Sequence, residues 1–305
     1  MSTKAKSKSK SRERKGHCFL CGRESTTSCT SCQKVHYCSR EHYIYHRQQN
    51  YCFPFRIVWR AGKGKCMIAS RDISALELIL FDTAVVVGPR NKGGPVCLDC
   101  GKETNNPYSC GICSFPLCGE LCQVGKAHQE ECRILQKISS IKDKTSVYQW
   151  ITPIRLLLKM ASNPRIYRQI QFLLDNNSTT VEEDESVKNT SKDLLQIFLR
   201  TDQLKQFSLE DFIWIRGILA TNCLMFGEEE SRALFPHFSL MNHSCCANAK
   251  HTIYINKRKI AVQAQTDIKE GDEIVINYVT FIQGTALRRE KLKGVWKYNK
   301  FTENN

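Results

Sequence analysis

Cysteine is the residue whose number and spacing most clearly predict chemistry in this sequence. Of the 17 cysteines, 13 fall in two blocks that share one pattern: two Cys-x2-Cys pairs, two ligands four residues apart, and a closing His and Cys. The chain begins with a polar, basic segment rather than a secretory signal peptide, so we expect these cysteines to bind metal rather than form disulfides. Cys66, Cys223, Cys245 and Cys246 lie outside the blocks.

Each block contains enough ligands for two zinc ions. A Cys-x2-Cys pair lets two thiolates reach one tetrahedral zinc ion, and two ligands four residues apart do the same from one helix face. We therefore expect four zinc ions in total. The expected ligands in the first block are Cys18, Cys21, Cys29, Cys32, Cys38, His42, His46 and Cys52. The expected ligands in the second block are Cys97, Cys100, Cys110, Cys113, Cys118, Cys122, His128 and Cys132.

The closing pair of the first block is less regular than that of the second. When the second block is laid onto the first, Cys52 is in register, but Gln48 takes the place of the expected histidine. His46, two positions earlier, is the best replacement, and its spacing to Cys52 requires a backbone that departs from a regular helix. The expected number of zinc ions falls to three if this pair does not bind.

Three shorter motifs lie outside the cysteine blocks. Gly62-Lys63-Gly64 precedes a strand pattern, and taken alone it indicates a tight turn. Asn242-His243-Ser244-Cys245 is followed downstream by Gly271-Asp272-Glu273-Ile274 and then by Tyr278. Taken singly, Asn242 would be a turn former, His243 a core histidine and Tyr278 a half-buried strand tyrosine.

Together, the order of these motifs resembles the SET domain, and each cysteine block resembles the MYND zinc finger. A SET pattern split by a zinc finger is similar to the SET-and-MYND-domain (SMYD) protein-lysine methyltransferases, and a further N-terminal finger resembles their arthropod-type branch. The resemblance implies an α+β fold: a SET-domain β-fold with an inserted MYND zinc finger, a helical segment, and a second N-terminal MYND zinc finger. It assigns Cys97, Cys100, Cys118 and Cys122 to one zinc ion of the inserted finger, and that finger's other four ligands to a second ion.

The resemblance and the composition together divide the chain into seven segments. They are a basic disordered tail (1–16), an N-terminal zinc finger, here the first finger (17–52), the N-terminal half of the SET domain (55–96), the inserted zinc finger, here the second finger (97–132), a helical insert (133–235), the SET catalytic core (236–298) and a truncated post-SET tail (299–305). Within the insert, apolar residues at helical spacing occur in Trp150–Met160, Ile166–Leu174 and Leu194–Leu199. Phe212–Phe226 resembles the helix that precedes the Asn-His-Ser-Cys motif in the family.

The resemblance implies transfer of a methyl group from S-adenosylmethionine to a lysine of a histone or another protein. A direct displacement requires accurate placement and an apolar channel that favours the neutral lysine amine. Tyr278 is the expected catalytic residue, because its hydroxyl would position the lysine nitrogen and the methyl group. The residues expected to bind the cofactor are Gly62, Lys63, Gly64, Asn222, Asn242, His243, Tyr278, Trp296 and Tyr298.

The sequence departs from the family at its C-terminus. Lys300, Thr302 and Asn305 stand where the family has post-SET cysteines that close the lysine channel, and Ala247 replaces a usual proline. These departures favour an alternative function, a catalytically weak or inactive adaptor that binds partner peptides through its zinc fingers. Retention of the SET motifs favours the enzyme, and a role in transcriptional regulation is expected for either.

The charge of the chain is uneven. The formal net charge is +15, and residues 1–16 hold seven basic residues against one acidic residue. This segment indicates a nuclear-localisation or nucleic-acid-contacting arm, or a solvated terminus that aids solubility. Thiolate ligands at four zinc sites would lower the charge to about +10, leaving about +4 outside the tail, so the body gives weak support for nucleic-acid binding. No apolar run is long enough for a membrane span, and we expect the protein in the nucleus, the cytoplasm or both.

Overall fold

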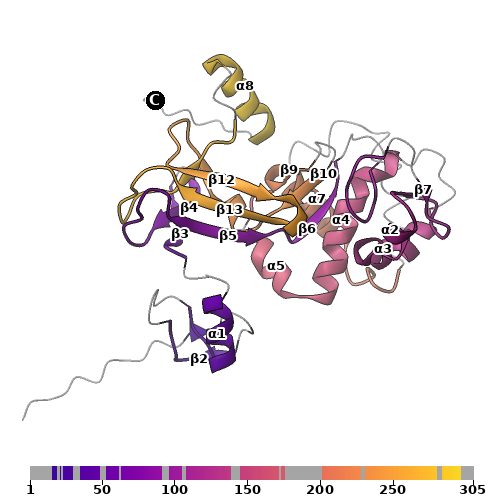
Figure 1. The fold of residues 1–305 in the computed structure, drawn as a ribbon, viewed down its shortest axis with the longest axis horizontal. Coiled ribbons are helices and arrows are strands. Elements are labelled where there is room, and N and C mark those ends of the chain that lie inside the picture. Colours follow the sequence, from indigo (N-terminus) through magenta and orange to yellow (C-terminus); the bar gives the residue numbers. More distant parts are fainter. Residues whose placement is uncertain are drawn as a thin grey trace, which may run out of the picture.

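The computed structural model of the chain is an assembly of small sheets with helices packed at one end (Figure 1). It describes residues 16–18, 21, 23–29, 35–48, 53–61, 63–90, 96–104, 108–138, 145–171, 173–175, 201–227, 231–279 and 284–296 of the 305. The mixture of helices and strands confirms the expected α+β class. Residues 1–15 of the expected tail lie outside the described ranges, and Gly16 already belongs to a strand.

The first finger is a small unit with little secondary structure. Its strands β1 (Gly16–His17) and β2 (Glu24–Ser25) pair antiparallel, and α1 (Arg40–Gln48) follows them. Figure 1 shows this unit, in indigo, as a separate lobe joined to the rest of the molecule at β3. Its described residues belong to neither of the two buried cores of the molecule.

The central sheets join segments that are far apart in the sequence. Strands β3 (Phe55–Arg60) and β4 (Gly64–Ala69) form a hairpin. Strands β12 (Ala249–Tyr254), β13 (Lys259–Ala264) and β5 (Leu78–Thr83) form an antiparallel sheet in that order. Apolar side chains of these strands, among them Met67 and Val262, form one buried core. The two halves of the expected SET domain therefore fold as one body.

Part of the expected helical insert is sheet. Strands β6 (Val86–Pro89), β10 (Ser231–Leu234) and β9 (Leu224–Phe226) form a three-stranded antiparallel sheet in that order. The prediction of a helical insert over 133–235 was therefore wrong for Leu224–Phe226 and Ser231–Leu234. The physical reason is that Leu224–Phe226 and Ser231–Leu234 pair with each other, and β10 also pairs with β6, so their backbone hydrogen bonds are made across strands.

Helix α4 (Thr145–Ser162) packs on this three-stranded sheet, and two further helices pack against α4. These two are α5 (Arg165–Ile170) and α7 (Leu209–Asn222), which begins with a capping box of Ser208 and Asp211. Helix α4 packs so closely on β6 that a Cβ atom at Gly88 would lie 2.4 Å from Thr152 Oγ1. The helix expected at Leu194–Leu199 lies outside the described ranges.

The second finger adjoins these helices (Figure 1). It contains β7 (Tyr108–Ser109), β8 (Pro116–Leu117), α2 (Glu120–Gln123) and α3 (Lys126–Gln136). Its buried residues, such as Phe115 and Leu117, share one continuous core with Trp150 and Ile154 of α4. The finger and the helices therefore stabilise each other by burying apolar surface.

The remaining elements lead to the C-terminal part of the described chain. They are η2 (Phe238–Leu240), β11 (Asn242–His243), η3 (Ile255–Lys257), β14 (Val275–Ile276) and α8 (Thr285–Trp296). Strands β11 and β14 pair in parallel and bring two of the expected SET motifs side by side. Among the described helices, none combines the length and the apolar character needed to cross a lipid bilayer.

Candidate functional site

The glycine-containing motif lies at the turn of the β3–β4 hairpin. Gly64 has φ +78°, a left-handed conformation that favours glycine, and it begins β4. Lys63 precedes it, whereas Gly62 lies outside the described residues. A Cβ atom at Gly64 would meet nothing closer than the Trp59 ring at 3.9 Å, so the glycine is required by its backbone conformation and not by crowding.

Asn242 connects this hairpin to the downstream motif. Its Nδ2 donates hydrogen bonds to the Lys65 carbonyl oxygen at 2.9 Å and to Glu273 Oε1 at 2.8 Å. Lys63 Nζ lies 3.0 Å from the other oxygen of Glu273. Burial alone would raise the pKa of Glu273, but hydrogen bonds from Asn242, Lys63 and Cys66 lower it overall. The glutamate is therefore ionised and holds three expected SET segments together.

His243, in β11, contacts Tyr278, which follows β14 in the chain. His243 Nδ1 accepts a hydrogen bond from the Tyr278 backbone N–H at 3.0 Å, and the two rings are 5.4 Å apart. Burial, followed by the charge of Arg288, lowers the pKa of His243. The histidine is therefore neutral, with its proton on Nε2, which lies 3.5 Å from Cys245 Sγ.

The Tyr278 hydroxyl is held by the backbone just before Asn242. It donates a hydrogen bond to the Met241 carbonyl oxygen at 2.5 Å. A hydroxyl that donates in this direction keeps its oxygen lone pairs available to accept a hydrogen bond from a substrate amine. Tyr278 is thus fixed in orientation by the same backbone segment that carries Asn242 and His243.

Asn222, another expected cofactor-binding residue, makes its side-chain hydrogen bonds outside this group. Asn222 Nδ2 donates to the carbonyl oxygens of Leu174 and Ile218, both at 2.8 Å, so its amide stabilises the end of α7. The Asn222 carbonyl oxygen accepts a hydrogen bond from Ser239 Oγ at 3.1 Å, close to the Asn242 segment in the chain. Trp296 is placed by its backbone at the end of α8, and Tyr298 lies outside the described residues.

Asp82 is a residue of this region that the motifs do not single out. Its Oδ2 accepts hydrogen bonds from the backbone N–H groups of His237 at 2.8 Å and Phe238 at 3.1 Å. Its Oδ1 lies 3.2 Å from His237 Nδ1. The buried carboxylate on β5 thus caps η2, the short helix that leads into Met241 and Asn242. An isolated aspartate in an apolar strand was the only sequence signal for it.

The second finger contains two groups of ligand atoms suited to zinc. Within each group, all ligand atoms lie within 4.8 Å of one another. Cys100 Sγ and Cys118 Sγ are 3.5 Å apart, and Cys110 Sγ and Cys132 Sγ are 3.7 Å apart. Two thiolates on one tetrahedral zinc ion are separated by about 3.7 Å, so these spacings fit the metal. The groups are Cys97, Cys100, Cys118 and Cys122, and Cys110, Cys113, His128 and Cys132.

The chemistry of these cysteines also suits a cation. Burial, more than any other cause, raises the pKa of Cys122 to about 12 and that of Cys132 to about 11. Burial also acts to raise the pKa of Cys97 and Cys110, but hydrogen bonds lower it overall. Burial lowers the pKa of His128, which keeps the imidazole in the neutral form that binds metal. A zinc ion would provide the positive charge that stabilises several thiolates at once.

A buried ion pair connects the second finger to the rest of the molecule. Arg155 of α4 donates to both carboxylate oxygens of Glu131 at 2.6 Å, and its Nη1 donates to the Val87 carbonyl oxygen on β6 at 2.8 Å. Burial raises the pKa of Glu131 despite the facing guanidinium, whereas Glu131 raises that of Arg155; the bidentate geometry identifies an ion pair. Since Glu131 adjoins Cys132, one finger ligand is tied to the sheet. Spacing in the sequence gave no signal for this pair.

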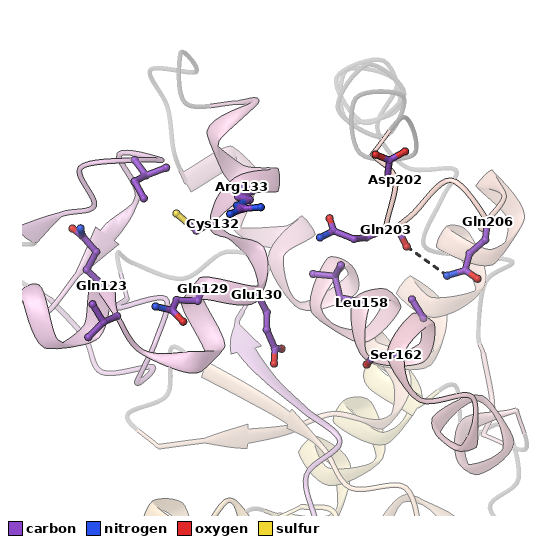
Figure 2. Close-up of a pocket in the computed structure, with 13 residues that line it drawn as sticks. Gln123, Gln129, Glu130, Cys132, Arg133, Leu158, Ser162, Asp202, Gln203 and Gln206 are labelled. Carbon is purple, nitrogen blue, oxygen red and sulfur yellow. Dashed lines mark hydrogen bonds between the residues drawn. The ribbon is translucent and has the colours of Figure 1, made fainter.

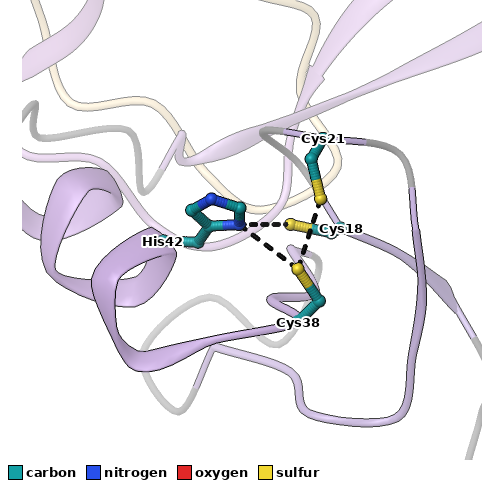
Figure 3. A group of neighbouring side chains, drawn as sticks. All are labelled: Cys18, Cys21, Cys38 and His42. Atoms are coloured by element: carbon teal, nitrogen blue, oxygen red, sulfur yellow. Dashed lines mark hydrogen bonds between the residues drawn. The ribbon is translucent and has the colours of Figure 1, made fainter.

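The first finger shows one of its two expected zinc groups (Figure 3). Cys18, Cys21, Cys38 and His42 converge, with His42 Nδ1 at 3.3 Å from the sulfur atoms of Cys18 and Cys38. The other expected group is only partly described. Cys29 is buried, but Cys32, Cys52 and the His46 side chain lie outside the described residues.

The expectation that ligands four residues apart share one helix face holds for one pair. His128 and Cys132 both lie within α3. Cys38 precedes α1, and Cys118 precedes α2, so these two ligands come from the turn before the helix. The difference arises because Cys38 and Cys118 lie in the turns that precede α1 and α2, where the backbone is not yet helical.

A cavity of about 930 Å³ lies between the second finger and the helices, away from Tyr278 (Figure 2). Figure 2 shows the side chains of Gln129 and Gln203 on its opposite walls. Apolar side chains, including Val124 and Leu158, also line it. The cavity is therefore lined by both polar amides and apolar side chains.

Comparisons with known proteins found a matching family model and several similar proteins. The family model described as SET domain matches residues 112–279, more than half of the chain. The SET domain-containing protein SmydA-8, isoform A, of Drosophila melanogaster is 29% identical over 244 residues, which cover 76% of this chain and 51% of that protein. The histone-lysine N-methyltransferase ASHR1 of Arabidopsis thaliana is 25% identical over 252 residues, covering 76% and 50%. The chain thus spans about half the length of these curated relatives.

A solved structure of the SET domain of LSMT bound to lysine and AdoHcy is also similar. It superposes with a TM-score of 0.48 at 13% identity, covering 87% of this chain and 57% of that chain.

Proposed function

This chain belongs to the SET-domain family, and we propose that it is an S-adenosylmethionine-dependent protein-lysine methyltransferase. One observation carries the proposal: the Tyr278 hydroxyl is oriented by the Met241 carbonyl, directly beside Asn242 and His243. We propose a histone or another protein with an accessible lysine as the substrate, and regulation of transcription as the process. The proposed location is the nucleus, the cytoplasm or both.

The residues around Tyr278 fit the proposed cofactor. The left-handed Gly64 leaves the hairpin backbone without a side chain, and Lys63 and Glu273 place a positive and a negative charge beside it. These residues, with the backbone of Asn242 and His243, would hold the amino-acid and adenine parts. S-adenosylmethionine supplies an activated methyl group when bound.

The work of the chain itself is to place and desolvate the lysine. A lysine amine can accept a methyl group only in its neutral form, and apolar surroundings lower its pKa. The Tyr278 oxygen would accept a hydrogen bond from that amine and fix its direction, while the hydroxyl keeps its own proton and donates it in a hydrogen bond to the Met241 carbonyl oxygen. His243 is neutral and holds the Tyr278 backbone, so it acts as a positioning residue.

Calorimetry with S-adenosylmethionine, followed by transfer of a radiolabelled methyl group to histones and to other proteins, tests this proposal. Tyr278→Phe is expected to lower the transfer rate about 100-fold, the lower end of the effect of a positioned proton-bonding group, with little loss of cofactor affinity. Tyr254→Phe, an exposed strand tyrosine, is the matched control. Absence of cofactor binding by the wild-type protein would contradict the proposal.

A second candidate function is a non-catalytic adaptor that binds peptides through the second finger. The cavity between α3 and α4 favours it, since it lies at the finger and not at Tyr278 (Figure 2). Proline-containing peptides that bind equally to the wild type and to Tyr278→Phe, and that dissociate when zinc is chelated, are expected for this function. Binding that is unaffected by chelation would exclude it.

A further inference from the structure

Two arginines on different elements face the same buried space behind the three-stranded sheet. Arg232 lies in β10 directly opposite Gly88 of β6, and Gly88 is the residue that α4 approaches most closely, at Thr152. Side chains of directly opposed residues project from the same face of a sheet, so Arg232 points toward the helices. Arg216 of α7 lies on that side, with its guanidinium carbon 4.3 Å from the centre of the Trp150 ring.

The polar groups gathered there are hydrogen-bond donors. Arg232 is only 8% exposed, and its Nε is buried without a hydrogen-bond partner. The indole Nε1 of Trp150, in the ring beneath Arg216, is likewise buried without a partner. A buried donor without an acceptor costs about 1–3 kcal/mol, and more when the group is charged. Two buried donors, one from α4 and one from β10, thus lack an acceptor, and the Arg216 guanidinium of α7 lies over the Trp150 ring.

No negative charge in the described part of the chain compensates these arginines. Neither Arg216 nor Arg232 has a carboxylate within ion-pair distance among the residues described. Burial lowers the pKa of both, and the charge of Arg232 lowers that of Arg216 further. Cys223 lies close to Arg232, but burial raises the pKa of this thiol to about 11, so it stays neutral.

We propose that Arg216, Arg232 and the Trp150 indole N–H form a binding site for a small oxyanion, of the phosphate, sulfate or carboxylate class. A guanidinium presents N–H groups in a flat fork that matches two oxygens of such an anion. The anion would satisfy the orphaned donors and neutralise two neighbouring positive charges at one position. The remaining exposure of Arg232 provides the access. The site is separate from Tyr278 and does not depend on methyl transfer.

A bound anion would brace the elements that lead to Tyr278. Arg216 belongs to α7, which ends at Asn222, and Arg232 belongs to β10, which continues toward η2 and Asn242. Linking α4, α7 and β10 through one ligand would stabilise the folded state more as the anion concentration rises, in a logarithmic dependence. The chain should therefore unfold at a higher temperature when the anion is present.

Thermal unfolding of the zinc-loaded chain in phosphate, sulfate or acetate, against chloride at equal ionic strength, tests the site. We expect at least one oxyanion to raise the unfolding temperature by about 2–4 °C when saturating. Arg232→Met should abolish this shift, whereas Arg165→Met, an exposed arginine on α5, should retain it. A response to phosphate and sulfate alone identifies a tetrahedral anion, and a response to acetate alone identifies a carboxylate.

The variants also separate a ligand site from a purely structural arginine. If Arg232 is part of an anion site, its buried charge is uncompensated in chloride. Arg232→Met removes that charge, so the variant in chloride should be at least as stable as the wild type. Arg216→Met provides a second measurement if Arg232→Met does not fold, and it should weaken the anion response by about tenfold in midpoint concentration, the loss of one charge-assisted hydrogen bond. Equal responses of wild type, Arg216→Met and Arg232→Met, or no oxyanion response in the wild type, would overturn the proposal.

Discussion

The two zinc fingers have similar ligand patterns but differ in how they are joined to the rest of the molecule. The second finger shares a continuous core with α4 and is tied to it by the Glu131–Arg155 ion pair. In addition, Arg258, which directly precedes β13 of the central sheet, donates to the Asp99 carbonyl oxygen at 3.3 Å, within the finger's first Cys-x2-Cys pair. The described residues of the first finger belong to neither buried core.

Ligand spacing therefore determines the local zinc geometry but not whether a finger packs into the core of the molecule. The apolar residues between the ligands determine that packing. In the second finger, Leu98, Phe115 and Leu117 are fully buried against the helices. We therefore expect the second finger to be part of the folding unit of the SET domain, and the first finger to unfold by itself.

Loss of a zinc ligand should give the largest difference in stability between variants of the two fingers. Cys113→Ser removes a fully buried ligand of the second finger and should destabilise the whole chain by several kcal/mol, since zinc binding contributes on the order of 10 kcal/mol to such modules. Cys21→Ser, which removes a ligand of the first finger, should leave the main unfolding transition in place. Thermal unfolding with zinc counting by native mass spectrometry measures both. Equal destabilisation by the two variants would show that the fingers are not different.

Breaking the buried ion pair should have the next largest effect. Arg155→Met leaves the Glu131 carboxylate buried and unpaired, which should cost about 3–5 kcal/mol in the free energy of unfolding. The double variant Arg155→Met with Glu131→Leu should recover most of that loss, because no isolated charge remains. Denaturant unfolding measures these values. A single variant as stable as the wild type would mean that the pair does not hold the finger.

Removing the link from the finger to the central sheet should have a smaller effect. Arg258→Lys removes the exposed guanidinium hydrogen bond to the Asp99 carbonyl, which should cost about 0.5–1 kcal/mol. Lysine keeps the charge, so the change isolates the hydrogen bond. Arg71→Lys, at an exposed surface ion pair, is the comparison. A loss above about 2 kcal/mol in Arg258→Lys would show that this link, and not the ion pair, is the main connection.

The smallest effect is expected outside both fingers, at the capped η2 helix. Burial alone would lower the pKa of His237, but the hydrogen bond and charge of Asp82 raise it overall. A histidine with a raised folded-state pKa stabilises the fold below its unfolded pKa of about 6.5 and loses this contribution as pH rises through the folded value. His237→Gln should therefore cost more stability at pH 5.5 than at pH 8, by less than about 1 kcal/mol. Unfolding midpoints at the two pH values test the sign, and an opposite sign would contradict the Asp82 pairing.

The sequence predicted the local parts of the site better than the contacts between segments. Thiol and imidazole spacing predicted which residues of the second finger are ligands, and the resemblance to the MYND zinc finger divided them into the two groups that the structure shows. The resemblance also assigned Lys63 and Asn242 to one cofactor site, and both contact Glu273 in the structure. Strands β9 and β10 were predicted as part of a helical insert, since Leu224–Phe226 and Ser231–Leu234 become sheet only by pairing with each other and, for β10, with Val86–Pro89. Asp82, Glu131 and Arg155 carry no motif, and their roles arise only when distant segments meet.

The position of the second finger within the chain also has a consequence for the order of folding during synthesis. Strand β5 pairs with β13, and the whole finger and helical insert are translated between them. The finger can bind zinc as soon as Cys132 has left the ribosome, whereas Glu131 must wait for Arg155, and β5 must wait for β13. Long-range strand pairing of this kind is slow and leaves sheet edges exposed in the meantime. In a growing chain the second finger would therefore bind its metal before the central sheet is complete. The unpaired edge of β5 would stay exposed to chaperones and to competing strands until the last third of the chain is made.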